Sequence, residues 1–144
     1  MTIFNPNDPG MANGNYFALP YSLEESEIAL ISVPWDVTTS YRAGTHKGPE
    51  AIIEASVQVD LYDVNVKDAW KTKIGTLPVD SKILKDNKKF RKIAENVIDG
   101  LEQGKEITDL EKDISLINKA STALNNKVYT SCRDLIKKGK ITGV

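Results

Sequence analysis

The sequence predicts an α/β fold with three layers, in which helices cover both faces of a mainly parallel sheet. Two short apolar runs, at residues 27–33 and 74–79, indicate strands, and helical patterns follow each of them. An order of strand, loop, helix, extended segment, strand, helix, helix and beginning strand is typical of this class. Residues 1–22 lack periodicity and contain several Pro, Gly and Asn residues, so we expect an irregular N-terminal arm there.

The first strand and helix are predicted from residues 27–57. The run 27–33 is almost wholly apolar and ends at a proline, which is typical of a strand buried on both faces. A polar loop follows at 34–47. Gly48-Pro49 predicts the start of a helix that extends to about Val57, because proline in the first turn loses no hydrogen bond. The inner face of this helix is expected to carry Ile52, Ile53 and Ser56.

The middle of the chain predicts two extended segments and a helix. Residues 59–66 alternate between apolar and polar, which indicates a half-buried strand or an extended segment. Residues 74–79 form a second short strand, and their proline indicates a sheet edge or a strand end. From 86 to 103 apolar residues recur at helical spacing, and Gly104 is the predicted stop.

A long helix is predicted from Thr108, as N-cap, to about Lys138, with Gly139 ending it. The seven-residue spacing of its apolar stripe is compatible with a coiled-coil seam, but we favour a helix packed on a sheet. Residues 141–144 then begin another strand. We therefore expect residues 23–144 to be the N-terminal part of a single domain, as a fragment or as half of a split protein. The stripe consists of Leu110, Ile114, Ile117, Ala120 or Ser121, Leu124, Val128 and Leu135.

Composition limits the chemistry of the chain. A lone cysteine, Cys132, excludes an internal disulfide and any zinc site built from several cysteines. The single histidine, His46, has no second metal-type residue at ligand spacing, so we expect it to be solvated or packed within its loop. The net charge of −1 argues against general nucleic-acid binding. Because no apolar run approaches 18 residues and no signal-peptide pattern occurs, we expect no membrane span and a cytoplasmic location.

Residues 33–56 carry the most specific pattern. They combine a strand end, a long polar loop and a helix start, and such loops bind ligands in open α/β folds. Asp36 is expected to cap backbone groups of the threonine two or three residues further on. Arg42 is expected to pin a carboxylate, and Gly44 to adopt a positive φ or allow a close backbone approach. The alternative interpretation is a self-hydrogen-bonded Ω-like loop without a chemical role.

This segment resembles the N-terminal signature of the ureohydrolase superfamily, which includes agmatinase, arginase and formimidoylglutamase. The signature combines Val-Pro-aromatic-Asp, Thr-Ser, Arg-x-Gly, Gly-Pro-x-Ala-Ile and an Ala-Ser helix end. The chain departs from it in having Arg-Ala-Gly for the more usual Arg-Pro-Gly, the sequence Thr45-His46-Lys47, and Ile53 for a frequent arginine. The matching residues are Val33, Pro34, Trp35, Asp36, Thr39, Ser40, Arg42, Gly44, Gly48, Pro49, Ala51, Ile52, Ala55 and Ser56.

The resemblance implies an arginase-like αβα domain that holds two Mn²⁺ ions. The family's metal-binding motifs would lie beyond Val144, so no metal ligand and no catalytic residue is expected within these 144 residues. The metal-bound hydroxide would attack a guanidinium or amidine carbon and release urea or formamide and an amine. The loop would shape one wall of the site entrance, through Asp36, Thr39, Ser40, Arg42, Gly44 and His46.

The resemblance also bears on substrate and assembly. An agmatinase-like substrate is favoured, while arginine, formimidoylglutamate and guanidino acids stay open. Family members commonly form trimers or hexamers, so the resemblance implies a homo-oligomer. The competing hypothesis is a catalytically silent α/β scaffold or interaction module that lacks the metal site.

Overall fold

The computed structural model describes residues 4–144, which form two compact units. The first unit contains residues 4–32, 48–78 and 132–144, and the second contains residues 33–47 and 79–131. The predicted α/β class is confirmed, because a parallel sheet and three α-helices are present in the described chain. None of the described helices is both long and apolar enough to cross a bilayer.

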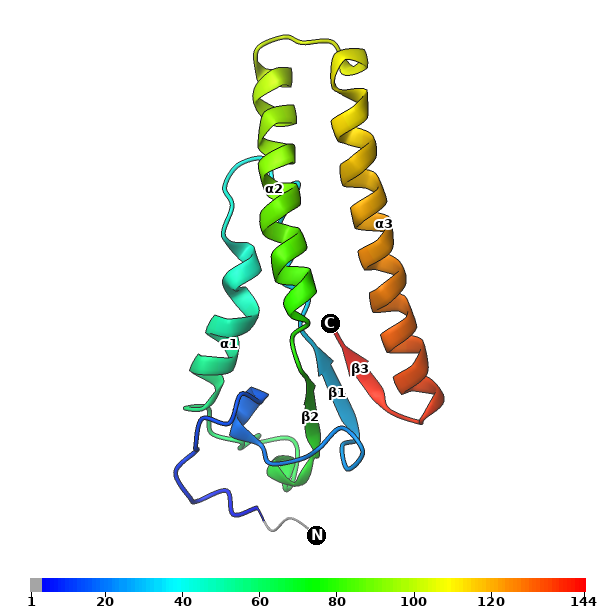
Figure 1. Cartoon of the computed structure of the whole chain (residues 1–144). Coiled ribbons are helices and arrows are strands. Elements are labelled where there is room, and N and C mark those ends of the chain that lie inside the picture. The colour runs from blue at the N-terminus through cyan, green and yellow to red at the C-terminus, as the bar shows by residue number, and fades with distance from the viewer. Residues whose placement is uncertain (1–3) are drawn as a thin grey trace. The chain divides into compact units, whose positions relative to one another are not determined.

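A three-stranded parallel sheet forms the centre of the first unit (Figure 1). Strand β1 (Ile28–Ile31) lies between β2 (Ile74–Leu77) and β3 (Ile141–Gly143). Ile28 pairs with Ile74 on one side and with Ile141 on the other. The two apolar runs at 27–33 and 74–79 are confirmed as β1 and β2, which are somewhat shorter than the runs, and the strand expected to begin at residue 141 is β3.

The N-terminal arm packs on this sheet through a short 3-10 helix, η1 (Tyr16–Ala18). The backbone N–H of Tyr16 donates to Thr76 Oγ1 at 3.0 Å, and its hydroxyl lies 2.9 Å from Ser32 Oγ. Helix α1 (Gly48–Ser56) begins at the predicted Gly-Pro pair. Its predicted inner face is only partly right, because Ser56 is buried while Ile52 is 57% exposed.

Of the two alternatives predicted for residues 59–66, the half-buried strand is wrong. Nearly every residue in this stretch is exposed, and none of them is in a strand. Asp63 supplies a physical reason, because its Oδ1 accepts the backbone N–H groups of Asn65 at 2.7 Å and Val66 at 3.1 Å. Such a turn competes with strand pairing for the backbone donors.

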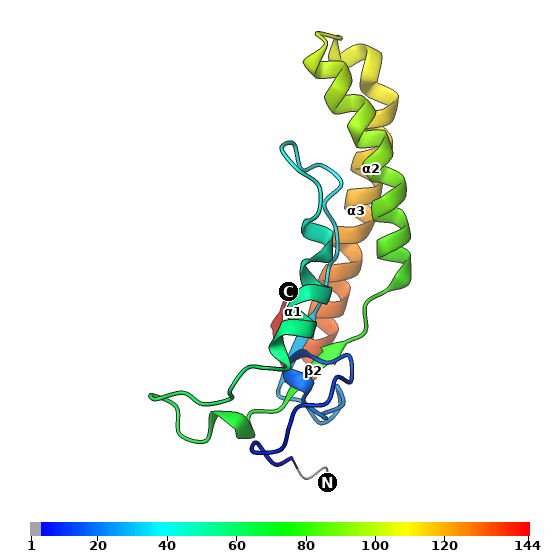
Figure 2. The same cartoon turned by 90° about the vertical axis from the view of Figure 1, so that its left-hand side faces the viewer.

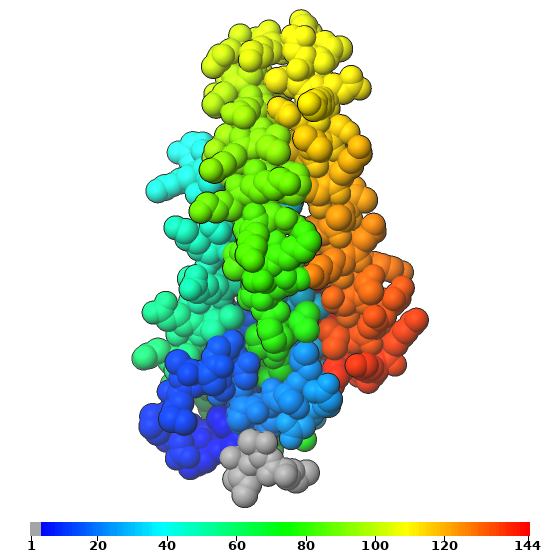
Figure 3. All heavy atoms as spheres, in the orientation of Figure 1, coloured from blue at the N-terminus to red at the C-terminus, as the bar shows by residue number. Residues whose placement is uncertain are grey.

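A helical hairpin forms most of the second unit. Helix α2 (Ser81–Glu102) and residues 107–131 of α3 (Ile107–Lys137) run antiparallel and side by side in both cartoon views (Figures 1 and 2). Figure 3 shows their side chains meeting near the turn that joins them. The first part of the apolar stripe of α3, Leu110, Ile114 and Ile117, packs in one cluster with Ala94 and Val97 of α2, whereas the favoured prediction was packing on a sheet. The core cluster consists of Val37, Ala94, Val97, Leu110 and Ile117.

The helix ends correct several predicted boundaries. Helix α2 begins five residues before the predicted start, because Asp80 is its N-cap and accepts the N–H of Lys82 at 2.7 Å. Helix α3 begins at Ile107, so Thr108 lies inside the first turn and is not the N-cap. The predicted stops at Gly104 and Gly139 are confirmed, with φ values of +81° and +78°.

Candidate functional site

The loop at residues 33–47, which carries the sequence signature, is organised around the buried carboxylate of Asp36. This side chain has no exposed surface, so each of its oxygens needs a hydrogen-bond donor. Oδ2 accepts the backbone N–H of Gly44 at 2.7 Å and that of His46 at 3.3 Å. The same oxygen lies 2.7 Å from Nδ1 of the His46 ring. One carboxylate thus ties together the two ends of the loop.

Asn87 of α2 holds Asp36 from the other side. Its side-chain oxygen accepts the backbone N–H of Asp36 at 2.8 Å, and its Nδ2 donates to Asp36 Oδ1 at 2.9 Å. Asn87 is itself buried, and it lies at helical spacing from the core residues Ala94 and Val97. The amide therefore makes a two-point contact inside the second unit, where water does not compete for these groups.

Arg91, one helical turn beyond Asn87, clamps the backbone that follows Asp36. Its guanidinium NH1 donates to the carbonyl oxygen of Thr39 at 2.6 Å and to Thr39 Oγ1 at 3.0 Å. The same nitrogen lies 3.3 Å from the carbonyl oxygens of Asp36 and Val37. Nε pairs with Glu95 at 3.0 Å on the outer side. The charge of Arg91 is thus placed among loop carbonyls and held there by a carboxylate.

Aromatic packing adds to these polar contacts. The ring of Trp35 lies 6.3 Å from that of Phe90, centroid to centroid, at an interplanar angle of 42°. Phe90 sits on α2 between Asn87 and Arg91, so three neighbouring positions of one helix contact the loop. Helix α2 therefore fixes the backbone from residue 35 to residue 39.

Hydrogen bonding decides the charge state of Asp36. Burial on its own raises the pKa of this carboxyl, because a low-dielectric environment disfavours the charged form. Hydrogen bonds from the His46 ring, from the Gly44 N–H, from the Asn87 amide and from the His46 N–H together outweigh burial. The pKa of Asp36 therefore lies well below its ordinary value of 3.8. Asp36 is a carboxylate that only accepts, so the proton between it and His46 belongs to Nδ1 of the ring.

The sequence-predicted residues have different fates in the structure. Asp36, Thr39, Gly44 and His46 belong to one network, and Gly44 has the predicted positive φ, +139°. The predicted capping by the Asp36 side chain is wrong, because Thr39 bonds instead to the backbone oxygen of Asp36, through its N–H at 3.2 Å and its Oγ1 at 3.0 Å.

Two predicted residues lie outside this network. Ser40 and Arg42 are exposed, and within residues 4–144 Arg42 forms no ion pair with a carboxylate. The guanidinium that clamps the loop is that of Arg91, which sequence reasoning did not single out. A signal was present, since Asn87 is a polar residue at a core position of an amphipathic helix, and Arg91 follows it at i+4.

The described residues do not fit a manganese site. Across residues 4–144, no group of three or more His, Cys, Asp or Glu side chains is placed to hold a metal ion. Asp36 and His46 lie together, but both Asp36 oxygens are already engaged by protein donors.

Comparison with known proteins identifies the family. A model described as the arginase family matches residues 26–142, so the chain belongs to this family. A curated relative, N(1)-aminopropylagmatine ureohydrolase of Synechocystis sp., is 43% identical over 42 residues. That match covers 29% of this chain and 14% of the relative, so the chain aligns with only a small part of that protein. No solved structure matches the chain significantly.

Proposed function

We propose that residues 23–144 form the N-terminal part of a ureohydrolase domain that hydrolyses a linear guanidino or amidino compound to urea or formamide and an amine. The match of the arginase family to residues 26–142 is the observation that carries this proposal. An agmatine-like substrate is the first choice. The short match to a protein named as an aminopropylagmatine ureohydrolase supports that choice.

In this proposal the loop 33–47 forms one wall of the site entrance. Its inner side is fixed by Asp36, Thr39, Gly44 and His46 against α2. Ser40 and Arg42 are exposed and would face the substrate. This arrangement suits the wall of a binding site, because the fixed inner side of the loop holds the two exposed residues in position.

A substrate that carries a carboxylate, such as arginine, formimidoylglutamate or a guanidino acid, is the second candidate. The exposed guanidinium of Arg42 favours it, because this group binds carboxylates in a bidentate manner. For agmatine, which has no carboxylate, the same charge would offer no attraction. Arg42→Ala should therefore raise the Michaelis constant for a substrate that carries a carboxylate and leave the Michaelis constant for agmatine unchanged.

The metal, the assembly and the location are further parts of the proposal. Arginase-family proteins generally depend on two metal ions, and we propose two Mn²⁺ whose ligands come from outside residues 4–144. When bound, such a pair supplies an activated water. We also propose a homo-oligomer, a trimer or hexamer, that works in the cytoplasm.

The test is to purify the protein from its natural source and measure its intact mass, its manganese content and its hydrolytic activity together. Agmatine, aminopropylagmatine, arginine and formimidoylglutamate are assayed for release of urea or formamide, with and without added Mn²⁺. We expect metal-dependent turnover of one of them by a species heavier than 15.9 kDa. A species of 15.9 kDa that binds no metal and hydrolyses none of these compounds would contradict the proposal and favour a silent scaffold.

A further inference from the structure

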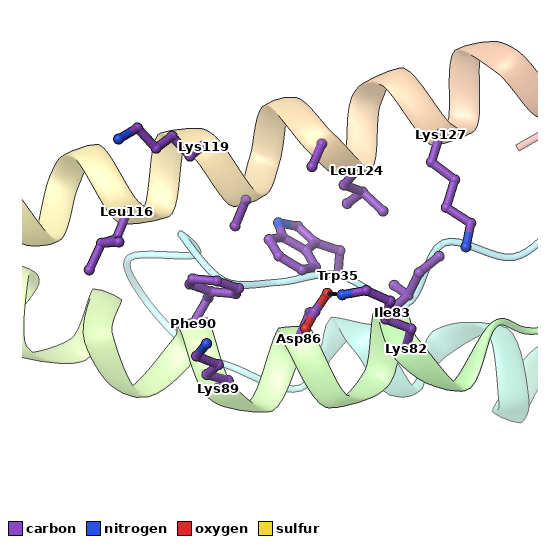
Figure 4. Close-up of a pocket in the computed structure, with 12 residues that line it drawn as sticks. Trp35, Lys82, Ile83, Asp86, Lys89, Phe90, Leu116, Lys119, Leu124 and Lys127 are labelled. Atoms are coloured by element: carbon purple, nitrogen blue, oxygen red, sulfur yellow. Dashed lines mark hydrogen bonds and ion pairs between the residues drawn. The ribbon is translucent and has the colours of Figure 1, made fainter.

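An apolar groove of about 390 Å³ lies between α2 and α3 in the second unit. Figure 4 shows the indole of Trp35 between the two helices, with Phe90 from α2 and Leu124 from α3 beside it and Leu116 further along α3. Leu116 is 40% exposed, so the groove is open to solvent along this helix. An open apolar groove between two helices is the kind of surface that binds a peptide segment.

Lysines surround this groove. Lys82 forms an ion pair with Asp86, with 2.5 Å between Nζ and Oδ2, and Lys127 forms an ion pair with Asp80. Lys89 lies 5.0 Å from the centre of the Phe90 ring, and Lys119 lines the groove from α3. Within the part of the chain that the structure describes, neither Lys89 nor Lys119 forms an ion pair. The groove therefore offers an apolar floor and two cations without acidic partners.

The segment 59–66 of the first unit has the complementary character. Its apolar side chains are exposed to an unusual degree, with Tyr62 at 81% and Val64 at 80%. The segment also carries Asp60 and Asp63 and no basic residue. Asp63 holds a turn through two backbone N–H groups, so part of the segment is already ordered before it binds.

We propose that the groove binds residues 59–66 of a second copy of this chain. Apolar side chains of the segment would cover the Trp35 and Phe90 rings, and its carboxylates would face Lys89 and Lys119. Charge complementarity supports this occupant, because the segment carries two acidic residues and no basic one, whereas Lys89 and Lys119 of the groove have no acidic partner within residues 4–144. The groove and the segment are different surfaces, so each copy contacts the next head to tail. Such contacts generate a closed ring when the rotation from one copy to the next closes the circle.

The test measures the mass of the purified chain by sedimentation over a range of concentrations and salt. The double variant Lys89→Glu/Lys119→Glu replaces attraction by repulsion, and we expect it to weaken association by on the order of tenfold or more. Asp60→Lys should also weaken association. The triple variant, in which all three charges are reversed, should regain part of the lost affinity, which simple unfolding would not produce.

Lys92→Glu and Lys112→Glu are the matched controls, because both lysines are exposed on the same two helices and neither lines the groove. They should leave association unchanged, and circular dichroism verifies that each variant is folded. A chain that stays monomeric at all concentrations would overturn the proposal, as would association that the groove variants leave unaltered. The readout is mass rather than turnover, so failure here is distinguishable from failure of the proposed catalytic function.

Discussion

Asn87 and Asp36 form a closed pair of hydrogen bonds between a helix and a loop. The amide oxygen of Asn87 takes the backbone N–H of Asp36 at 2.8 Å, while its Nδ2 gives a hydrogen bond to Asp36 Oδ1 at 2.9 Å. Both residues are buried, with exposures of 3% and 2%. The contact therefore specifies both the backbone and the side chain of Asp36, which no apolar residue at position 87 could do.

Removal of this amide tests how much the second unit depends on it. We expect Asn87→Ala to destabilise the chain by about 2–4 kcal/mol, because it leaves a backbone N–H and a carboxylate oxygen of Asp36 without their partner. Chemical unfolding followed by circular dichroism measures the change. Asn96→Ala is the matched control, since Asn96 is exposed on the same helix. Equal effects of the two substitutions would contradict the importance of the buried pair.

Arg91 is expected to determine the mobility of the loop rather than the presence of the helix. Arg91→Ala removes the donor shared by the carbonyls of Asp36, Val37 and Thr39. The amides of Thr39 and Gly44 should then exchange with solvent about ten times faster or more, since hydrogen bonds to a charged donor contribute about 1.5–3 kcal/mol. Hydrogen exchange with mass spectrometry measures this change.

Lys92→Ala is the control for that experiment, because Lys92 is the next residue of α2 and is exposed. It should leave exchange in the loop unchanged. Arg91→Lys should lie between the wild type and the alanine variant, because the ammonium keeps the charge and loses the planar donor geometry. Protection of the loop amides in Arg91→Ala at the wild-type level would show that the clamp has no role.

The fold class and most elements were predictable because they depend on local patterns. Apolar runs predicted β1 and β2, and the glycines at 104 and 139 predicted where the helices end. The prediction of a strand at residues 59–66 failed, because their alternation is typical of a strand while the side chain of Asp63 binds backbone N–H groups in a turn. Alternation alone does not supply the neighbouring strand that a strand requires.

The candidate site was only half predictable, for a related reason. Asp36, Gly44 and His46 lie within eleven consecutive residues, so their grouping followed from the sequence signature. Asn87 and Arg91 lie about fifty residues further along the chain, and only the packing of α2 on the loop brings them to Asp36. Local pattern carries no information on that packing, so it indicated Arg42, as a residue that pins a carboxylate, and did not indicate Arg91.

Gly44 is expected to tolerate no side chain, although the space around it is open. Its φ of +139° lies in a region that residues with a Cβ rarely adopt, while no atom would lie within 4 Å of an added Cβ. Gly44→Ala should cost about 1–3 kcal/mol through backbone strain or through loss of its N–H bond to Asp36. Gly48→Ala is the control, because the surroundings of Gly48 are equally open and its φ is ordinary. Thermal unfolding compares the two, and equal melting temperatures would contradict the strain argument.

The acid sensitivity of the second unit should depend on Asp36. Because the pKa of Asp36 in the folded chain is below its ordinary value of 3.8, ionisation of this group stabilises the fold fully at pH values above 3.8. That contribution is lost as the pH falls below 3.8 towards the folded pKa. Asp36→Asn cannot ionise, so the wild type should exceed it most in stability at pH 5, and the gap should narrow steadily down to pH 2.5.

Urea unfolding of both proteins at intervals across this pH range measures the gap. Asp99→Asn serves as the control, because Asp99 is an exposed carboxylate of α2 that takes no part in the network around Asp36. Its difference from the wild type should stay near zero at every pH. A gap between the wild type and Asp36→Asn that is constant from pH 5 to pH 2.5 would show that the carboxylate is not preferentially ionised in the fold. The hydrogen bonds from Gly44, His46 and Asn87 would then have to be weaker in solution than their lengths indicate.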